Sequence, residues 1–166
     1  GLYDTGCEYD PNNVIGTLAD FERINFDGTE NTIDAAIAIS STDKLDNATP
    51  SNEYGIPKSA TVEAQLNDTV QKYGRSTGLT RGTIIGIDAT LSVGYSSGTA
   101  LFVNQIVVSS NRGPFIKAGD SGSLLVTDPG RNPVGLLFAG NGSGKIAIAN
   151  PIQAVLDTFK VTIDGE

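Results

Sequence analysis

The sequence predicts an all-β fold, and three observations lead to this prediction. The 166 residues include 20 glycines and 7 prolines, so turns are frequent. The apolar segments are short, and stretches of polar, turn-forming residues separate them. No helical segments lie between them to build parallel crossovers, which favours an antiparallel barrel or sandwich. Hydrophobic residues make up 39% of the chain, enough for a packed core.

The expected elements follow from local patterns. Apolar residues within 14–26 keep no strict period, which predicts one or two irregular strands. The nearly continuous apolar run at 31–39 predicts a buried strand with one carboxylate, Asp34, near its start. Only 151–159 has apolar residues at helical spacing, and Pro151 suits a first helical turn. Further strands are expected at 69–73, 82–93, 100–109, 123–127, 134–139 and 145–149.

A change of composition divides the chain. Between 43 and 58, Asp, Asn, Ser, Thr and Pro replace most large apolar residues, which indicates a surface linker. We therefore expect residues 1–42 and 59–166 to form separate parts joined by this linker.

Composition also excludes several classes of function. The chain has 19 acidic and 11 basic residues and a net charge of −8, without a basic stripe, so we expect no nucleic-acid partner. No apolar run approaches the roughly 20 residues of a membrane span, so no membrane contact is expected. Cys7 is the single cysteine, so no intrachain disulfide can form. The chain has no histidine, so a metal site is not expected either.

The most informative motif is Gly-Asp-Ser-Gly-Ser at residues 119–123. Gly119 allows the backbone to bend so that its N–H and that of Ser121 point at one developing oxyanion. An α/β-hydrolase turn would need glycine at 123 and a following helix, whereas Ser123 opens a strand. Taken alone, the motif is also a common turn composition. A serine nucleophile needs a base, usually imidazole, and the chain has no histidine. The sequence thus contains a candidate nucleophile without the base that it needs.

Three segments resemble the trypsin/chymotrypsin family of serine proteases and follow one another in the family's order. They are the Asp-led strand 32–39, the serine loop 119–123 and the apolar strand 134–140. The segment 70–82 is similar to the opening strand and turn of the family's second barrel. The chain looks most like a disulfide-free, bacterial-type branch. The resemblance implies a double antiparallel β-barrel with an incomplete first barrel and a C-terminal helix. It also implies peptide hydrolysis through an acyl-enzyme without a cofactor, on a polypeptide substrate.

The resemblance assigns roles to individual residues. Ser121 would be the nucleophile, and Asp34 would orient the missing imidazole, although Asp34 also fits a surface carboxylate that begins a strand. Gly119 and Ser121 would supply the oxyanion hole. Asp120 would be structural and held by a positive group, for which the sequence offers Lys117, Arg112 or Arg75.

Substrate contacts are also implied. Phe115 would lie at the base of the primary specificity pocket and favour an apolar or small side chain, or it belongs simply to the core. Phe138 and Gly140 would lie along the substrate, with the Gly140 backbone free to pair with an extended chain.

The missing histidine leaves three arrangements open. The chain is a product of cleavage that stays bound to an N-terminal fragment bearing the histidine, which we favour. Alternatively, it is a stable truncation or a pseudoprotease that acts as a noncatalytic β-rich binding module.

Two weaker motifs carry little weight. Asp4-Thr5-Gly6 lacks the strand and second copy of an aspartic protease, and Gly140–Lys145 fails the spacing of a phosphate loop.

Overall fold

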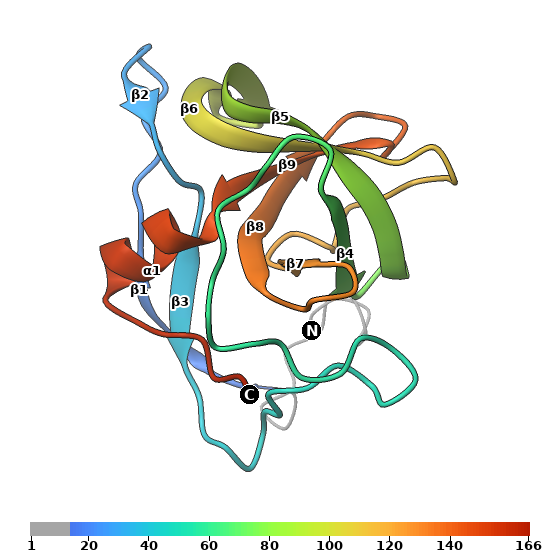
Figure 1. The fold of residues 1–166 in the computed structure, drawn as a ribbon. Helices are drawn as coiled ribbons and strands as arrows, with labels where there is room; N and C mark the ends of the chain where they lie inside the picture. Colours follow the sequence, from blue (N-terminus) through green and yellow to red (C-terminus); the bar gives the residue numbers. More distant parts are fainter. Residues whose placement is uncertain (1–13) are drawn as a thin grey trace.

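The computed structural model describes residues 14–166, so Cys7 and the Asp4–Gly6 tripeptide lie outside the described residues. As predicted, the fold is all-β with one short helix at the C-terminus (Figure 1). The elements are β1 (Thr17–Phe21), β2 (Glu30–Asn31), β3 (Ala36–Ile39), β4 (Thr69–Gly74), β5 (Gly78–Tyr95), β6 (Gly98–Ser109), β7 (Leu124–Thr127), β8 (Pro133–Gly140), β9 (Ile146–Pro151) and α1 (Ile152–Phe159).

A closed barrel forms the larger part of the molecule. Its sheet has seven strands in the order β2-β6-β5-β4-β7-β8-β9, and an additional β6–β9 pairing closes every strand except β2 into a ring. Closure leaves these strands without free edges. Alternate side chains of the strands point inward and fill the barrel, among them Val70, Ile84, Val108, Leu125, Val134 and Leu137.

The smaller sheet consists of β1 and β3 alone, paired antiparallel from Thr17↔Ile39 to Phe21↔Ala36. It lies beside α1 on one flank of the barrel (Figure 1). All five residues of β1 are exposed. This part is an incomplete first barrel, as the resemblance implied.

The expected strand at 31–39 is shorter than predicted, because only Ala36–Ile39 pairs with β1. The backbone of Asp34 bonds to a side chain instead of a neighbouring strand. Its N–H donates to Asn150 Oδ1 at 3.1 Å, and its carbonyl accepts from Asn150 Nδ2 at 2.9 Å. An amide side chain thus satisfies the groups that a strand ladder would otherwise use.

Residues 43–58 contain turns but no strand. The C-terminus returns to the end of this segment. The Glu166 N–H donates to the Pro57 carbonyl, and the Ser59 N–H donates to the Glu166 carbonyl, both at 3.0 Å. The Glu166 carboxylate also pairs with Lys58 and Arg131. Within residues 14–166, no helix is long and apolar enough to cross a membrane.

Candidate active site

Ser121 lies exposed in the loop that leads into β7. Its Oγ donates a hydrogen bond to the Phe138 carbonyl at 3.2 Å. The Gly122 N–H donates to the Leu137 carbonyl at 2.7 Å, so the loop is attached to β8 at Ser121 and at the next residue.

Two serines hold the peptide planes of this loop. Ser76 Oγ donates to the Ala118 carbonyl at 2.6 Å, and Ser123 Oγ donates to the Asp120 carbonyl at 2.5 Å. In a planar trans peptide the N–H points opposite to the carbonyl, so these bonds also orient the N–H groups of Gly119 and Ser121. Neither N–H is hydrogen-bonded to any residue of the described chain. The Ser123 hydroxyl therefore has a structural role in this loop.

Gly119 adopts a φ of +97°, which strains any residue with a side chain. A Cβ atom there would lie 2.6 Å from Ser76 Oγ, so both conformation and space require glycine at this position.

Asp120 lies fully buried beneath the loop and forms an ion pair with Lys72, which is also fully buried, at 3.5 Å. Its carboxylate accepts bonds from the N–H groups of Ser76 (2.7 Å) and Lys117 (2.9 Å) and from Thr77 Oγ1 (2.8 Å). Burial raises the pKa of Asp120, but these hydrogen bonds and the Lys72 charge outweigh it, and the net pKa lies below its ordinary value. Burial lowers the pKa of Lys72, and the Asp120 charge offsets this only in part.

The buried cation beside Asp120 is Lys72, which was not among the three residues, Lys117, Arg112 and Arg75, that the sequence offered. Lys117 reaches Asp120 through its backbone N–H, and the paired ammonium group is that of Lys72. The sequence did contain a signal for this pair. Lys72 is the single lysine of the mostly buried strand β4, and a buried charge requires a partner of opposite charge.

Asp34 lies between the buried residues Ile33 and Ala35, just before β3. Asn150, itself fully buried, holds its backbone, and Tyr95 OH donates to its Oδ2 at 2.6 Å. Burial, the hydrogen bond to Asp34 and its negative charge all raise the pKa of Tyr95. Sequence reasoning missed Tyr95 and Asn150. Asn150 was detectable as a polar residue inside an apolar strand.

Aromatic rings connect the surroundings of Asp34 and Ser121. The centroids of Tyr95 and Phe102 lie 6.4 Å apart, and those of Phe102 and Phe138 lie 4.9 Å apart. Tyr95 contacts Asp34, and the Phe138 carbonyl accepts the Ser121 bond. The two residues singled out in the sequence are thereby linked through one continuous set of contacts.

A cavity of about 240 Å³ lies next to Ser121, and its lining includes Phe138 and Gly140. A second cavity of about 660 Å³ extends beyond it, and Lys117 lines both. Phe115 lines neither of them, because its side chain is fully buried in the barrel core. Three of the candidate site residues thus share one cavity, whereas Phe115 packs inside the barrel.

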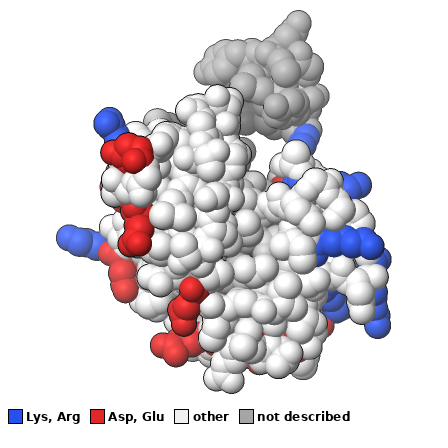
Figure 2. Space-filling model, turned by 90° about the horizontal axis from the view of Figure 1, so that it is seen from above, with Lys and Arg blue, Asp and Glu red and all other residues white. Residues whose placement is uncertain are grey.

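Charge is unevenly distributed on the molecule. Figure 2 shows acidic side chains mainly on the left of the visible face, together with some basic ones, and further basic side chains on the right, with a mostly uncharged surface between them. In residues 14–166, no three His, Cys, Asp or Glu side chains gather closely enough to hold a metal ion.

Comparison with protein families gives one match, to the Nal1 C-terminal domain, over residues 48–162. This match covers well over half of the chain. The chain belongs to the Nal1 C-terminal domain family. The matched residues include the whole barrel, the Ser121 loop and α1, whereas Asp34 and the β1–β3 sheet of this Nal1-type chain precede the match. Among curated proteins, nothing matches.

Solved structures similar to this Nal1-type chain are bacterial chymotrypsin-like serine proteases. Cellulomonas bogoriensis chymotrypsin has a TM-score of 0.68 at 22% identity, covering 93% of this chain and 78% of that one. Thermobifida fusca protease A has a TM-score of 0.66 at 23% identity, with 82% and 70% covered. Nocardiopsis protease has a TM-score of 0.64 at 22% identity, with 89% and 78% covered. These similarities establish the chymotrypsin-like fold.

Proposed function

We propose that this chain is the larger part of a trypsin-like serine endopeptidase in which Ser121 is the nucleophile and a histidine comes from another polypeptide segment. The observation that carries the proposal is the arrangement around Ser121. An exposed hydroxyl lies beside a cavity, and two N–H groups oriented by Ser76 and Ser123 remain available for an oxyanion.

In the proposed reaction, Ser121 Oγ attacks the carbonyl carbon of the scissile peptide, and its proton passes to the added imidazole. The N–H groups of Gly119 and Ser121 bind the resulting oxyanion. The C–N bond then breaks, the imidazolium returns the proton to the amine, and an ester to Ser121 remains, which water hydrolyses by the reverse proton transfers. The Asp120–Lys72 pair would keep the loop in this geometry.

Asp34 would orient the imidazole and stabilise its protonated form. Asn150 holds the Asp34 backbone, and Tyr95 occupies Oδ2. No hydrogen bond from the described residues reaches Oδ1, so this oxygen is the one we assign to the imidazole.

The β1–β3 sheet is where we expect the histidine-bearing segment to attach. Large apolar side chains of this region are exposed, namely Ile15 at 62%, Leu18 at 63%, Phe21 at 56% and Ile39 at 72%. Among residues 14–166, each of these strands pairs only with the other, and its second edge can accept a further strand by backbone pairing. A segment that completes the first barrel would cover this surface and bring the histidine toward Asp34.

The direct test measures cleavage of peptide anilides by the chain with and without an added polypeptide that carries the proposed histidine-bearing segment. We expect almost no turnover by the chain alone, because loss of one triad member leaves only the small rate supplied by binding and the oxyanion hole. The mixture should be active, and its rate should fall as the pH drops through about 6.5, where imidazole becomes protonated. Free imidazole added to the chain alone should restore a smaller part of the rate.

Two variants serve as the pair for this test. Ser121→Ala should abolish activity and labelling by a fluorophosphonate, whereas Ser97→Ala, at the exposed tip of the β5–β6 hairpin, should leave both unchanged. Comparable turnover by the lone chain, or activity of the mixture that contains Ser121→Ala, would show that another group performs the chemistry.

A noncatalytic binding module is the second candidate, and the Tyr95–Asp34 hydrogen bond favours it. A carboxylate already bound to a tyrosine hydroxyl forms a stable contact between the two parts of the molecule without any imidazole. For this candidate, the mixture would bind peptides, but a fluorophosphonate would leave Ser121 unmodified.

A further inference from the structure

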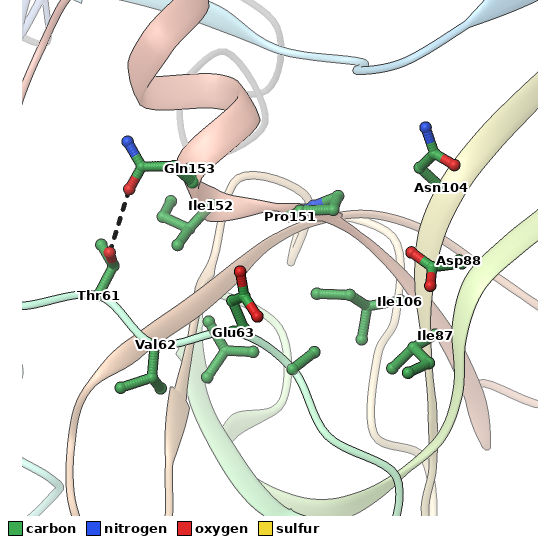
Figure 3. Close-up of a pocket in the computed structure, with 12 residues that line it drawn as sticks. Thr61, Val62, Glu63, Ile87, Asp88, Asn104, Ile106, Pro151, Ile152 and Gln153 are labelled. Atoms are coloured by element: carbon green, nitrogen blue, oxygen red, sulfur yellow. Dashed lines mark hydrogen bonds between the residues drawn. The ribbon is translucent and has the colours of Figure 1, made fainter.

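A separate cavity of about 510 Å³ lies where the segment 61–64 crosses β5, β6 and the start of α1 (Figure 3). No residue lines both this cavity and those beside Ser121. Its volume lies in the range of about 300–1,000 Å³ typical of small-molecule sites.

The floor of the cavity is apolar. Ile106, Val134 and Ile152 line it, and each is at most 3% exposed. Val62 and Ile87, each 38% exposed, lie higher on its walls. An aliphatic chain that fills this space would remove both partly exposed side chains from water.

The backbone is irregular at the same place. The β5–β6 pairing shifts register between Gly86 and Ala89, so Ile87 and Asp88 are not paired in the ladder. Asp88 has a φ of +50°, and Asn104 on the facing strand has a φ of +60°. A bulge of this kind redirects side chains, and here it places Ile87 and Asp88 on the cavity wall (Figure 3).

The charged groups of the cavity all carry one sign. The Glu63 and Asp88 carboxylates enter from opposite sides, with Ile106 between them (Figure 3). Within the described residues, neither carboxylate forms a salt bridge or a side-chain hydrogen bond, and no Lys or Arg lines the cavity. Gln153 differs, because its amide already bonds to Thr61 and Asp157.

We propose that this cavity binds a primary alkylammonium ion, with the chain on Ile106 and Ile152 and the ammonium group between Glu63 and Asp88. The apolar floor accounts for the aliphatic part of the ligand, and the two unpaired carboxylates account for its positive charge. Such a group occurs in a free amine and in a lysine side chain of a polypeptide. The proposal does not depend on the proposed peptidase activity.

The test follows backbone amide chemical shifts by NMR during titration of the full chain with n-hexylammonium. Amides of residues 61–64, 87–88 and 104–106 should shift, and 1-hexanol and hexanoate should bind more weakly by on the order of fivefold or more. A blocked Ala-Lys-Ala peptide distinguishes the sources. If it shifts the same amides, the ligand is a polypeptide lysine, and if hexylammonium alone does so, the ligand is a free amine.

Paired variants test the carboxylates. Glu63→Gln combined with Asp88→Asn should weaken hexylammonium binding on the order of fivefold and leave 1-hexanol binding unchanged. Asparagine tolerates the positive φ at position 88. The control, Glu30→Gln with Asp43→Asn, changes net charge equally at exposed positions outside the cavity and should have no effect. Equal binding of all three probes, shifts elsewhere, or an equal effect of both double variants would overturn the proposal.

Discussion

The barrel and the β1–β3 sheet are built from similar apolar residues but differ in whether those residues are covered. Barrel strands have partners on both sides, and side chains such as Val70 and Leu125 are completely buried. In the part of the chain that the structure describes, β1 and β3 pair only with each other, and Leu18 and Ile39 remain 63% and 72% exposed. Apolar character alone therefore does not produce a core. A closed ring of strands does so in the barrel, whereas the apolar side chains of the described β1–β3 sheet remain exposed.

A matched pair of phenylalanines tests this difference most strongly. Phe115→Ala should lower the free energy of unfolding by about 3–5 kcal/mol, because it leaves a cavity in the closed barrel. Phe21→Ala on β1, where the side chain is 56% exposed, should change it by less than about 0.5 kcal/mol. Urea denaturation of both variants measures the two values, and equal losses would contradict the contrast between the two parts.

A pair of aspartates sharpens the same comparison for charge. Asp120→Asn should cost about 3 kcal/mol, because it leaves the Lys72 ammonium buried without its partner. Asp20→Asn on exposed β1 should cost less than about 0.5 kcal/mol.

The pH dependence of stability gives a second measurement for Asp120. Since the folded-state pKa of Asp120 is lowered, its contribution is complete above an unfolded pKa of about 3.9 and is lost as the pH falls through the folded-state value. Urea denaturation of the wild type between pH 6 and 3 should therefore show a steeper acid loss than that of Asp120→Asn. Parallel curves would contradict this assignment.

The smallest expected effect concerns the Tyr95–Asp34 hydrogen bond, which joins the barrel to the segment that leads into β3. Tyr95→Phe removes the hydrogen bond to Asp34 and should cost about 1–2 kcal/mol, since the acceptor is charged. The folded-state pKa of Tyr95 is raised, so its contribution is complete below about pH 10 and declines as the pH rises further.

Denaturation at pH 8 and at pH 10.5 should therefore show a larger loss for the wild type than for Tyr95→Phe. Tyr73→Phe serves as the control, because Tyr73 OH forms no hydrogen bond with the described residues and should keep the wild-type difference. An unchanged wild-type value at the higher pH would show that this bond does not link the two parts.

Local patterns in the sequence determined the all-β class, the approximate strand positions, α1 and the Gly119–Ser123 loop. Those features depend on alternation, turn residues and glycine conformation, which act over a few neighbouring residues. Resemblance to the chymotrypsin-like family added the incomplete double barrel, which the structure confirms. The expected strand at 31–39 was only half right, because Asn150, distant in sequence, takes the backbone bonds of Asp34.

Only the tertiary structure decided which distant residues meet. It paired Lys72 with Asp120, brought Tyr95 to Asp34, set Ser76 beneath the Ala118 carbonyl and buried Phe115 in the barrel. The tertiary structure also forms the cavity lined by Glu63 and Asp88, which no sequence motif predicted. Each of these contacts depends on strand register and barrel closure, in which the position of one residue is set by the packing of the whole sheet, so no local pattern could contain them.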